Sequence, residues 1–388
     1  MDERGGMADT SGRQPPPAQR GKAATWLSSV FEVSPAGLNW PRGVMFLDVA
    51  LVPLIVFWAI GYEQYLLSAV FGLLFAALED PGGSYRSRAW HIALFGLIGA
   101  GVTALGFGIG GQDWGWMALT AFAVTLAAGL MVAFGTRRFV NALLLNIWFL
   151  IALALGFGLH DSAHITSHTW AQAASWAGGS LLWIVITFLW WLSHGRRDRP
   201  QPFAELPGDT ARRKLTPPLI MFAVIRALVM FATVALAFGL NLDHGLWMPI
   251  AAMVAMKPSL EQSTLVAAQR LAGALIGAIA AALLLLIPTS EHGLKLFAVT
   301  RGLEVVALIL FMHGAAIRFW NYAYYCAAIA AAVLILLDLQ QPSDYAAEGY
   351  RVLWTLCGAG LGVLVMLLAG LLGKRAAKRT TKAPPHPA

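Results

Sequence analysis

The sequence has little charge. Only 12% of its 388 residues are Asp, Glu, Lys or Arg, whereas 58% are hydrophobic, and the mean hydropathy is +0.65. A soluble domain carries far more charge on its surface, so a soluble fold is excluded. The apolar runs reach the roughly 20 residues needed to cross a bilayer, and they lack the period-two alternation of a membrane β-barrel. The sequence therefore predicts an all-α, polytopic transmembrane bundle.

Cysteines and catalytic motifs are also scarce. Cys326 and Cys357 both fall within apolar runs, which excludes a disulfide framework and a cysteine metal site. There is no P-loop, HExxH motif, pair of catalytic acids or Ser-His set within the runs. His160, His164 and His168 have a helical spacing that would suit zinc, but they fall in a polar outer loop. We predict no enzyme activity, no cofactor and no metal site.

The apolar runs predict about twelve spans, arranged as two six-span repeats. In each half the second span ends in a polar turn with a proline, followed by arginine and a Gly-rich helix. The predicted divisions are residues 1–42 as a disordered N-terminal tail, 43–192 as the first half, 193–217 as a cytoplasmic linker, 218–373 as the second half and 374–388 as a basic C-terminal tail.

Positive charge is unevenly distributed over this map. If the N-terminus is cytoplasmic, 24 of the 27 Lys and Arg residues fall on the inner side, and only Lys295, Arg301 and Arg351 fall outside. The positive-inside rule then places both termini in the cytoplasm, and the Ala-, Gly- and Arg-rich composition fits a bacterial protein. Because topology accounts for the basic excess, nucleic acid is not needed as a partner.

The densest polar chemistry is in the segment from Met256 to Gly277. Pro258 ends the preceding span, and Ser259 has the position of an N-cap for the next helix. Further along that helix, Gly273, Gly277 and Ala281 form a ridge of small residues that lets another helix approach closely. The pattern predicts a helix break followed by a tightly packed helix.

Two cations flank this break. Lys257 and Arg270 are either inner-boundary side chains that snorkel to water or a cationic vestibule that attracts an anionic substrate. The first half has a related turn with Asp80, Arg86 and Arg88, where an acid–base network is the alternative to substrate binding. We take Lys257, Arg270, Arg86 and Arg88 as candidate substrate-binding residues.

Glu304 is the deepest carboxylate of its half. An ionisable group within a span is costly and is often functional, so Glu304 is our first candidate for proton coupling. The structural alternative is that Glu304 is a partner for Arg301. Asp80 and Pro258 complete the candidate coupling or gating residues.

Several short motifs resemble the integral-membrane module of the fusaric acid resistance and aromatic acid exporter family. Those of the second half are Arg226, Gly239, Trp247, Lys257-Pro258-Ser259, Thr264, Arg270, Gly273, Gly277, Tyr322, Arg351, Thr355 and Gly358, and those of the first half are Asp80, Gly83, Arg86 and Arg88. Ala274 departs from the threonine often found in the family, and the extended cytoplasmic domain of many members is absent. The resemblance implies an inner-membrane exporter of organic or aromatic acids, and we add Trp247 to the candidate substrate-binding residues.

We therefore expect a proton-driven exporter, because the sequence has no ATP-binding domain. The expected partners are a small organic anion, the lipid bilayer, and either further copies of the chain or a periplasmic accessory protein. One alternative is the major facilitator superfamily, although Ala76 replaces a glycine of its signature loop. Another is a non-transporting accessory or scaffold subunit of a membrane complex.

Overall fold

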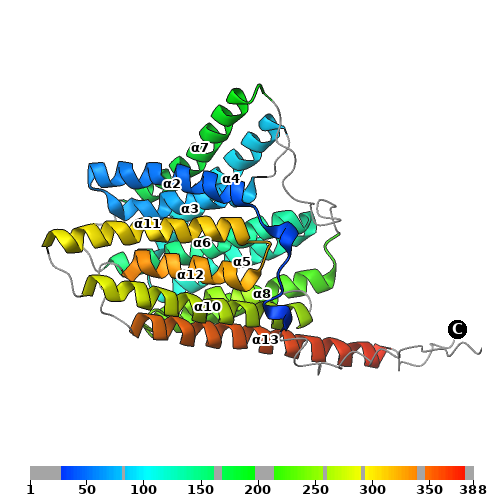
Figure 1. Cartoon of the computed structure of the whole chain (residues 1–388). Helices are drawn as coiled ribbons and strands as arrows, with labels where there is room; N and C mark the ends of the chain where they lie inside the picture. The colour runs from blue at the N-terminus through cyan, green and yellow to red at the C-terminus, as the bar shows by residue number, and fades with distance from the viewer. Residues whose placement is uncertain are drawn as a thin grey trace, which may run out of the picture.

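The structure, a computed structural model, describes residues 28–80, 84–160, 168–196, 214–256, 260–289, 293–338 and 346–380. These residues form helices and turns without a strand, which confirms the all-α prediction. Most of the helices run side by side in a bundle (Figure 1). Their bounds are α2 (Trp40–Ile60), α3 (Leu66–Glu79), α4 (Tyr85–Gly110), α5 (Trp114–Leu130), α6 (Thr136–His160), α7 (Thr169–Ser193), α8 (Pro217–Gly239), α9 (Trp247–Ala255), α10 (Leu260–Thr289), α11 (Gly293–Ile317), α12 (Tyr322–Asp338) and α13 (Ala346–Thr380).

Eight of these helices are long and apolar enough to cross a membrane, namely α2, α4, α5, α6, α7, α8, α10 and α13. The chain is therefore a polytopic membrane protein. Of the other α-helices, α3, α9 and α12 have only 14, 9 and 17 residues, and α11 carries Lys295, Arg301 and Glu304. Length and composition thus support eight spans in the described part of the chain, where the apolar runs predicted about twelve.

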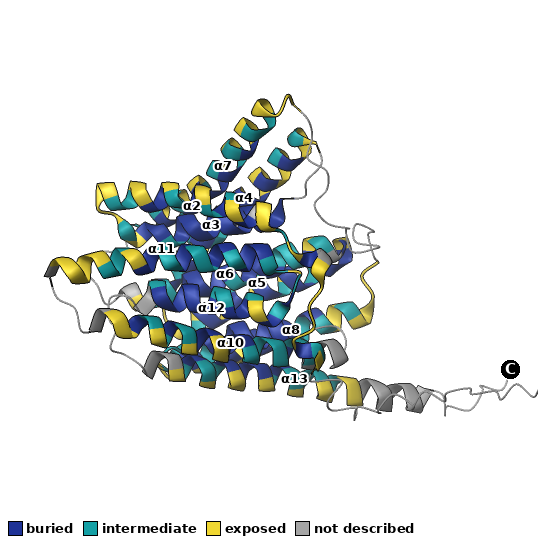
Figure 2. Ribbon diagram, in the orientation of Figure 1, coloured by how far each residue is buried: buried dark blue, intermediate teal, exposed yellow. Residues whose placement is uncertain are grey.

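Apolar side chains cover the outside of the bundle. Leu97 on α4 and Leu283 on α10, for example, are 71% and 62% exposed, and the outward faces of the helices are yellow in Figure 2. A soluble protein rarely exposes so much contiguous apolar surface. These faces are therefore suited to contact with lipid.

The two shortest α-helices, α3 and α9, lie in the interior. All residues of α9 are buried, as are all residues of α3 except Leu67. In the sequence a proline follows shortly after each helix, Pro81 after α3 and Pro258 after α9, and proline cannot continue the helical hydrogen-bond pattern. Each short helix is the second of six, counting from α2 and from α8.

An arginine donates a hydrogen bond to the last turn of each short helix. Arg137 Nη2 on α6 is 3.3 Å from the carbonyl oxygen of Glu79 in α3. Arg226 Nη2 on α8 is 3.1 Å from the carbonyl oxygen of Met253 in α9. The last carbonyls of a helix have no partner within it and attract positive charge. Both helix ends are therefore stabilised by a neighbouring cation.

The packing partners of the first six helices recur in the last six. α3 packs on α7 as α9 packs on α13, and α4 packs on α6 as α10 packs on α12. The main contacts between the two sets join α5 to α8 and α2 to α11. The beginning of the described chain and the end of α13 lie at the same end of the bundle (Figure 1).

Residues 28–39, which the sequence analysis placed in the N-terminal tail, pack across the ends of α10, α11 and α12. The carbonyl oxygen of Val30 accepts hydrogen bonds from Gln269 Nε2 at 3.4 Å and from Asn321 Nδ2 at 3.3 Å. The backbone N–H of Ser34 donates to the carbonyl oxygen of Trp320 at 2.8 Å. The structure thus ties this part of the tail to the second half, whereas residues 1–27 lie outside the described residues.

The other predicted segment boundaries can be compared with the helix ends. α7 ends at Ser193 and α8 begins at Pro217, on either side of the predicted linker, of which residues 197–213 lie outside the described residues. α13 continues beyond Lys374 to Thr380, so the helix extends into the predicted C-terminal tail.

A glycine lets α13 lie directly against the backbone of α9. A Cβ on Gly358 would meet the carbonyl group of Met248, whereas a Cβ on Gly360 of the same helix would meet open space. We expect Gly358→Ala to lower the free energy of unfolding by about 1–3 kcal/mol through overpacking, measured as a lower thermal unfolding midpoint in detergent. Gly360→Ala is the matched control and should keep or raise the midpoint, because alanine favours helix. Equal midpoints for the two variants would contradict this packing.

Candidate functional site

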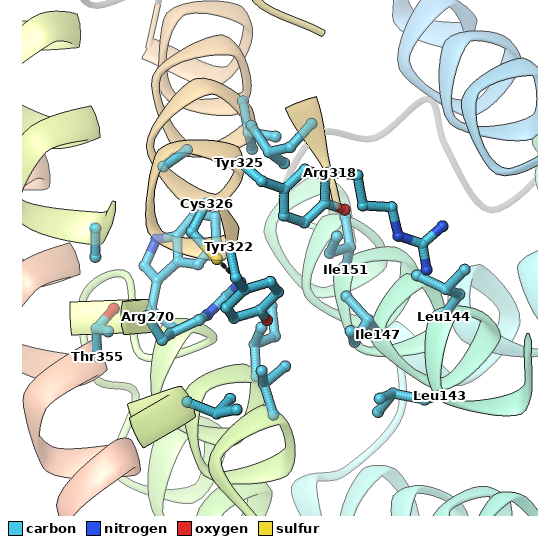
Figure 3. A pocket seen from close by; sticks show the side chains of 18 of the residues that line it. Leu143, Leu144, Ile147, Ile151, Arg270, Arg318, Tyr322, Tyr325, Cys326 and Thr355 are labelled. Atoms are coloured by element: carbon cyan, nitrogen blue, oxygen red, sulfur yellow. Dashed lines mark hydrogen bonds between the residues drawn. The ribbon is translucent and has the colours of Figure 1, made fainter. Parts of the chain in front are cut away.

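A cavity of about 280 Å³ lies between α3, α6, α9, α10, α12 and α13. Most of its lining is apolar, and aromatic rings come from Phe71 and Phe75 on α3 and from Tyr322 and Tyr325 on α12. Figure 3 shows aliphatic side chains of α6, such as Ile147, across the cavity from the tyrosines of α12. Both halves of the chain therefore contribute to one cavity.

Three arginines line this cavity: Arg270 from α10, Arg318 from the turn after α11, and Arg351 from α13. None of the described lining residues is an aspartate or a glutamate. A guanidinium group binds a carboxylate through paired N–H donors, and its charge cannot be removed at physiological pH. The cavity is therefore suited to a small anion with an apolar or aromatic body.

Arg270 reaches the cavity because α10 and α12 approach closely. A Cβ on Gly273 or Gly277 would meet atoms of α12, so glycine at these positions permits the contact. Arg270 lies about one turn before this ridge, and its Nη1 is 3.9 Å from the sulfur of Cys326. Figure 3 shows the side chains of Arg270, Cys326 and Tyr322 gathered together. The small-residue ridge seen in the sequence thus packs on α12.

Arg351 is a lining residue that the sequence analysis did not select. Its guanidinium carbon lies 3.7 Å from the centre of the Trp247 ring, and the residue is 4% exposed. Cation–π contact of this kind is strongest where water is excluded. The count of Lys and Arg assigned Arg351 to the outer side. Its presence among the family motifs was the signal that could have identified it as a candidate site residue. Trp247, which the sequence analysis did select, lines the same cavity.

Arg88 and Asp80 form a buried ion pair away from the cavity lining. Arg88 Nε donates to Asp80 Oδ1 at 2.7 Å, and Arg88 Nη2 donates to Asp80 Oδ2. Trp183 Nε1 donates to the same carboxylate at 3.3 Å. These contacts correspond to the acid–base network that the sequence left open for this turn, and they hold the end of α3 to α4 and α7.

The remaining predicted site residues include one that the structure describes away from the cavity and others that it does not describe. Arg86 is exposed and is not among the described lining residues. Lys257, Pro258 and His164 lie outside the described residues.

Glu304 takes part in a polar cluster between α2 and α11. Its carboxylate accepts hydrogen bonds from Arg301 Nη1 at 3.0 Å and from Trp58 Nε1 at 2.5 Å. Arg301 Nη2 also pairs with Glu63, which precedes α3, and its guanidinium carbon lies 5.0 Å from the centre of the Trp58 ring. Glu304 is thus a partner of Arg301, and its role in coupling stays a prediction.

Residues 228–365 match the family model described as fusaric acid resistance protein-like. This confirms the resemblance for the second half. No curated protein and no solved structure matches the chain significantly.

The fusaric acid resistance protein-like module contains all three arginines of the cavity, from Arg270 to Arg351, together with Trp247. The first half contributes the apolar lining from α3 and α6. With its eight apolar helices and this module, the chain is a transporter-like membrane protein.

Proposed function

We propose that the protein is an inner-membrane exporter of small organic or aromatic acids, driven by the proton motive force. The observation that carries the proposal is the cavity in which Arg270, Arg318 and Arg351 lie among apolar and aromatic side chains, with no acid among the described lining residues. An anion would exchange its hydration shell there for guanidinium donors. Such a site favours transport of an anion over chemical conversion, because the described lining offers no pair of general acid and base.

The size of the cavity limits the substrate. Pockets for drug-sized ligands occupy about 300–1,000 Å³, so a cavity of about 280 Å³ takes a small molecule. Tyr322, Tyr325, Phe71 and Phe75 offer ring surfaces on which a planar body can pack. A one-ring aromatic carboxylate satisfies both the charge and the volume.

We further propose that the chain consists of two six-helix repeats that rock about this cavity, with both termini in the cytoplasm. The recurring packing partners support the repeats, and the inner bias of Lys and Arg supports the orientation. Short helices at equivalent positions of two repeats commonly mark the substrate site of a transporter. α3 and α9 are such a pair, and both line the cavity.

Inside-out membrane vesicles test the function. Vesicles that contain the protein should accumulate radiolabelled 4-hydroxybenzoate when a proton gradient is imposed, and vesicles without it should not. A protonophore should abolish the accumulation. If no aromatic or aliphatic acid in a broad panel accumulates above the empty vesicles, the export proposal is wrong.

Glu304 is the proposed coupling carboxylate. Protonation would weaken its bonds to Arg301 and Trp58 and so loosen the α2–α11 contact between the halves. We expect Glu304→Gln to reduce gradient-driven accumulation to the level seen with a protonophore, while exchange of labelled for unlabelled acid continues. Glu63→Gln is the matched control, because its carboxylate contacts the same Arg301 but is 39% exposed. Full accumulation by Glu304→Gln would exclude Glu304 from coupling.

A further inference from the structure

Two glycines make the same contact in the two halves. A Cβ on Gly179 of α7 would meet the carbonyl oxygen of Ala69 in α3, and a Cβ on Gly358 of α13 would meet the carbonyl oxygen of Met248 in α9. The offset is 179 residues for both partners (248 minus 69 and 358 minus 179). A single offset therefore relates the α3–α7 contact to the α9–α13 contact.

The same offset relates two side-chain pairs of different chemistry. In the first half Ser68 Oγ donates to Gln172 Oε1 at 2.5 Å, and both residues are buried. Adding the offset to these positions gives Trp247 and Arg351, which form the cation–π contact of the cavity. A neutral hydrogen bond in the first half thus corresponds to a cation on an aromatic face in the second.

The space beside these pairs also differs. Trp176 is completely buried, and its ring stacks on that of Trp148 with a centroid distance of 4.8 Å. The offset takes Trp176 to Thr355, which lines the cavity. The indole of Trp176 fills this position in the first half. At the equivalent position of the second half, Thr355 is smaller and leaves part of the space open as the cavity.

We propose that the cations of the anion site come from the second half alone, and that Arg351 is the cation that binds the substrate carboxylate together with Arg270. The inference rests on the proposed function and assigns a residue to it. Trp247 acts as a positioning residue, because stacking on its ring fixes the plane of the guanidinium. The N–H donors lie in that plane, so stacking leaves their geometry suited to a carboxylate. The equivalent position of the first half is neutral and closed by Trp176.

Binding to the purified chain in lipid nanodiscs tests this assignment, with benzoate as the anionic probe and benzamide as its neutral analogue. Calorimetry should show one benzoate bound per chain. Arg351→Gln should weaken benzoate binding at least tenfold and remove the preference for benzoate over benzamide, while Arg351→Lys should restore part of that preference. Ser68 is the first-half equivalent of Trp247, so Ser68→Ala is the control and should leave the affinities for benzoate and benzamide unchanged.

Trp247→Leu tests the same assignment without a change of charge. It replaces Arg351→Gln in the test if that variant fails to fold. It should reduce the preference for benzoate while neutral binding persists. Two benzoates per chain, or wild-type preference for benzoate in the Arg351→Gln or Trp247→Leu variant, would overturn the assignment and leave the export proposal standing. If the wild-type chain binds neither benzoate nor other organic acids, the proposed function itself fails.

Discussion

Replacement of Asp80 by asparagine is expected to lower the free energy of unfolding by about 3–5 kcal/mol. The Asp80 and Arg88 side chains are only 4% and 2% exposed, and removal of one partner leaves the other charge buried without compensation. Trp183 would also lose a charged acceptor. The measurement is the thermal unfolding midpoint in detergent, together with the amount of monodisperse protein recovered.

A double variant separates a structural role for Asp80 from a role in coupling. Asp80→Leu combined with Arg88→Met removes both charges and should recover most of the lost stability, because apolar replacement of a buried ion pair is often neutral. If Asp80→Asn unfolds like the wild type but fails to accumulate substrate, the ion-pair explanation is wrong. Asp80 would then act in coupling, as the sequence analysis predicted.

Replacement of Arg270 by glutamine is expected to reduce the initial rate of acid uptake into inside-out vesicles by about 30-fold or more. Loss of one partner from a buried, charged hydrogen bond costs about 2 kcal/mol or more, and every 1.4 kcal/mol corresponds to about tenfold. Arg270 is placed against α12 by the glycine ridge, within the cavity. Its charge should therefore act directly on a bound anion.

Matched variants distinguish the site from the general charge of the protein. Arg270→Lys keeps the charge but loses the planar fork, so its uptake should be intermediate. Lys214→Gln removes an exposed cation that precedes α8 and should leave uptake unchanged. If Arg270→Gln transports at the wild-type rate with normal protein amount, Arg270 is a snorkelling cation, the alternative already present in the sequence.

The small-residue pattern in the sequence predicted a close helix contact but not its partner. Gly273 and Gly277 indicate that some helix approaches α10, because small side chains with a four-residue spacing form a flat face. That the partner is α12, which brings Cys326 next to Arg270, depends on long-range packing. A periodic pattern describes one face of a helix and does not identify the helix that packs against that face.

The count of Lys and Arg residues over loops did not identify the individual cations that line the cavity. Arg351 was counted as an outer residue and was not selected, and its guanidinium lines the cavity against the Trp247 ring. Arg88 was selected for substrate binding, and the fold instead gives it Asp80 as a partner. The positive-inside rule concerns sums over loops, whereas each of these outcomes is set by one neighbouring side chain.

The number of spans was predicted from hydropathy, and eight helices of the described residues have the length and composition of a span. Hydropathy detects continuous apolar sequence, and the run that contains α9 is apolar enough to be counted as a span. Only nine of its residues, Trp247–Ala255, are helical, and a turn precedes them. All residues of α9 are buried because other helices pack around it, and its amino-acid composition alone does not predict this burial.

The N-terminal segment has a consequence for how the cavity can open. Residues 28–39 bind α10 through Gln269 and the α11–α12 turn through Asn321, and Asn39 N donates to the carbonyl oxygen of Ala316 in α11 at 2.8 Å. These bonds join the three helices at one end, so we expect the helices to move together if the cavity opens. None of these bonds reaches α6, which lines the cavity opposite α12, so we expect a substrate to pass between α6 and α12.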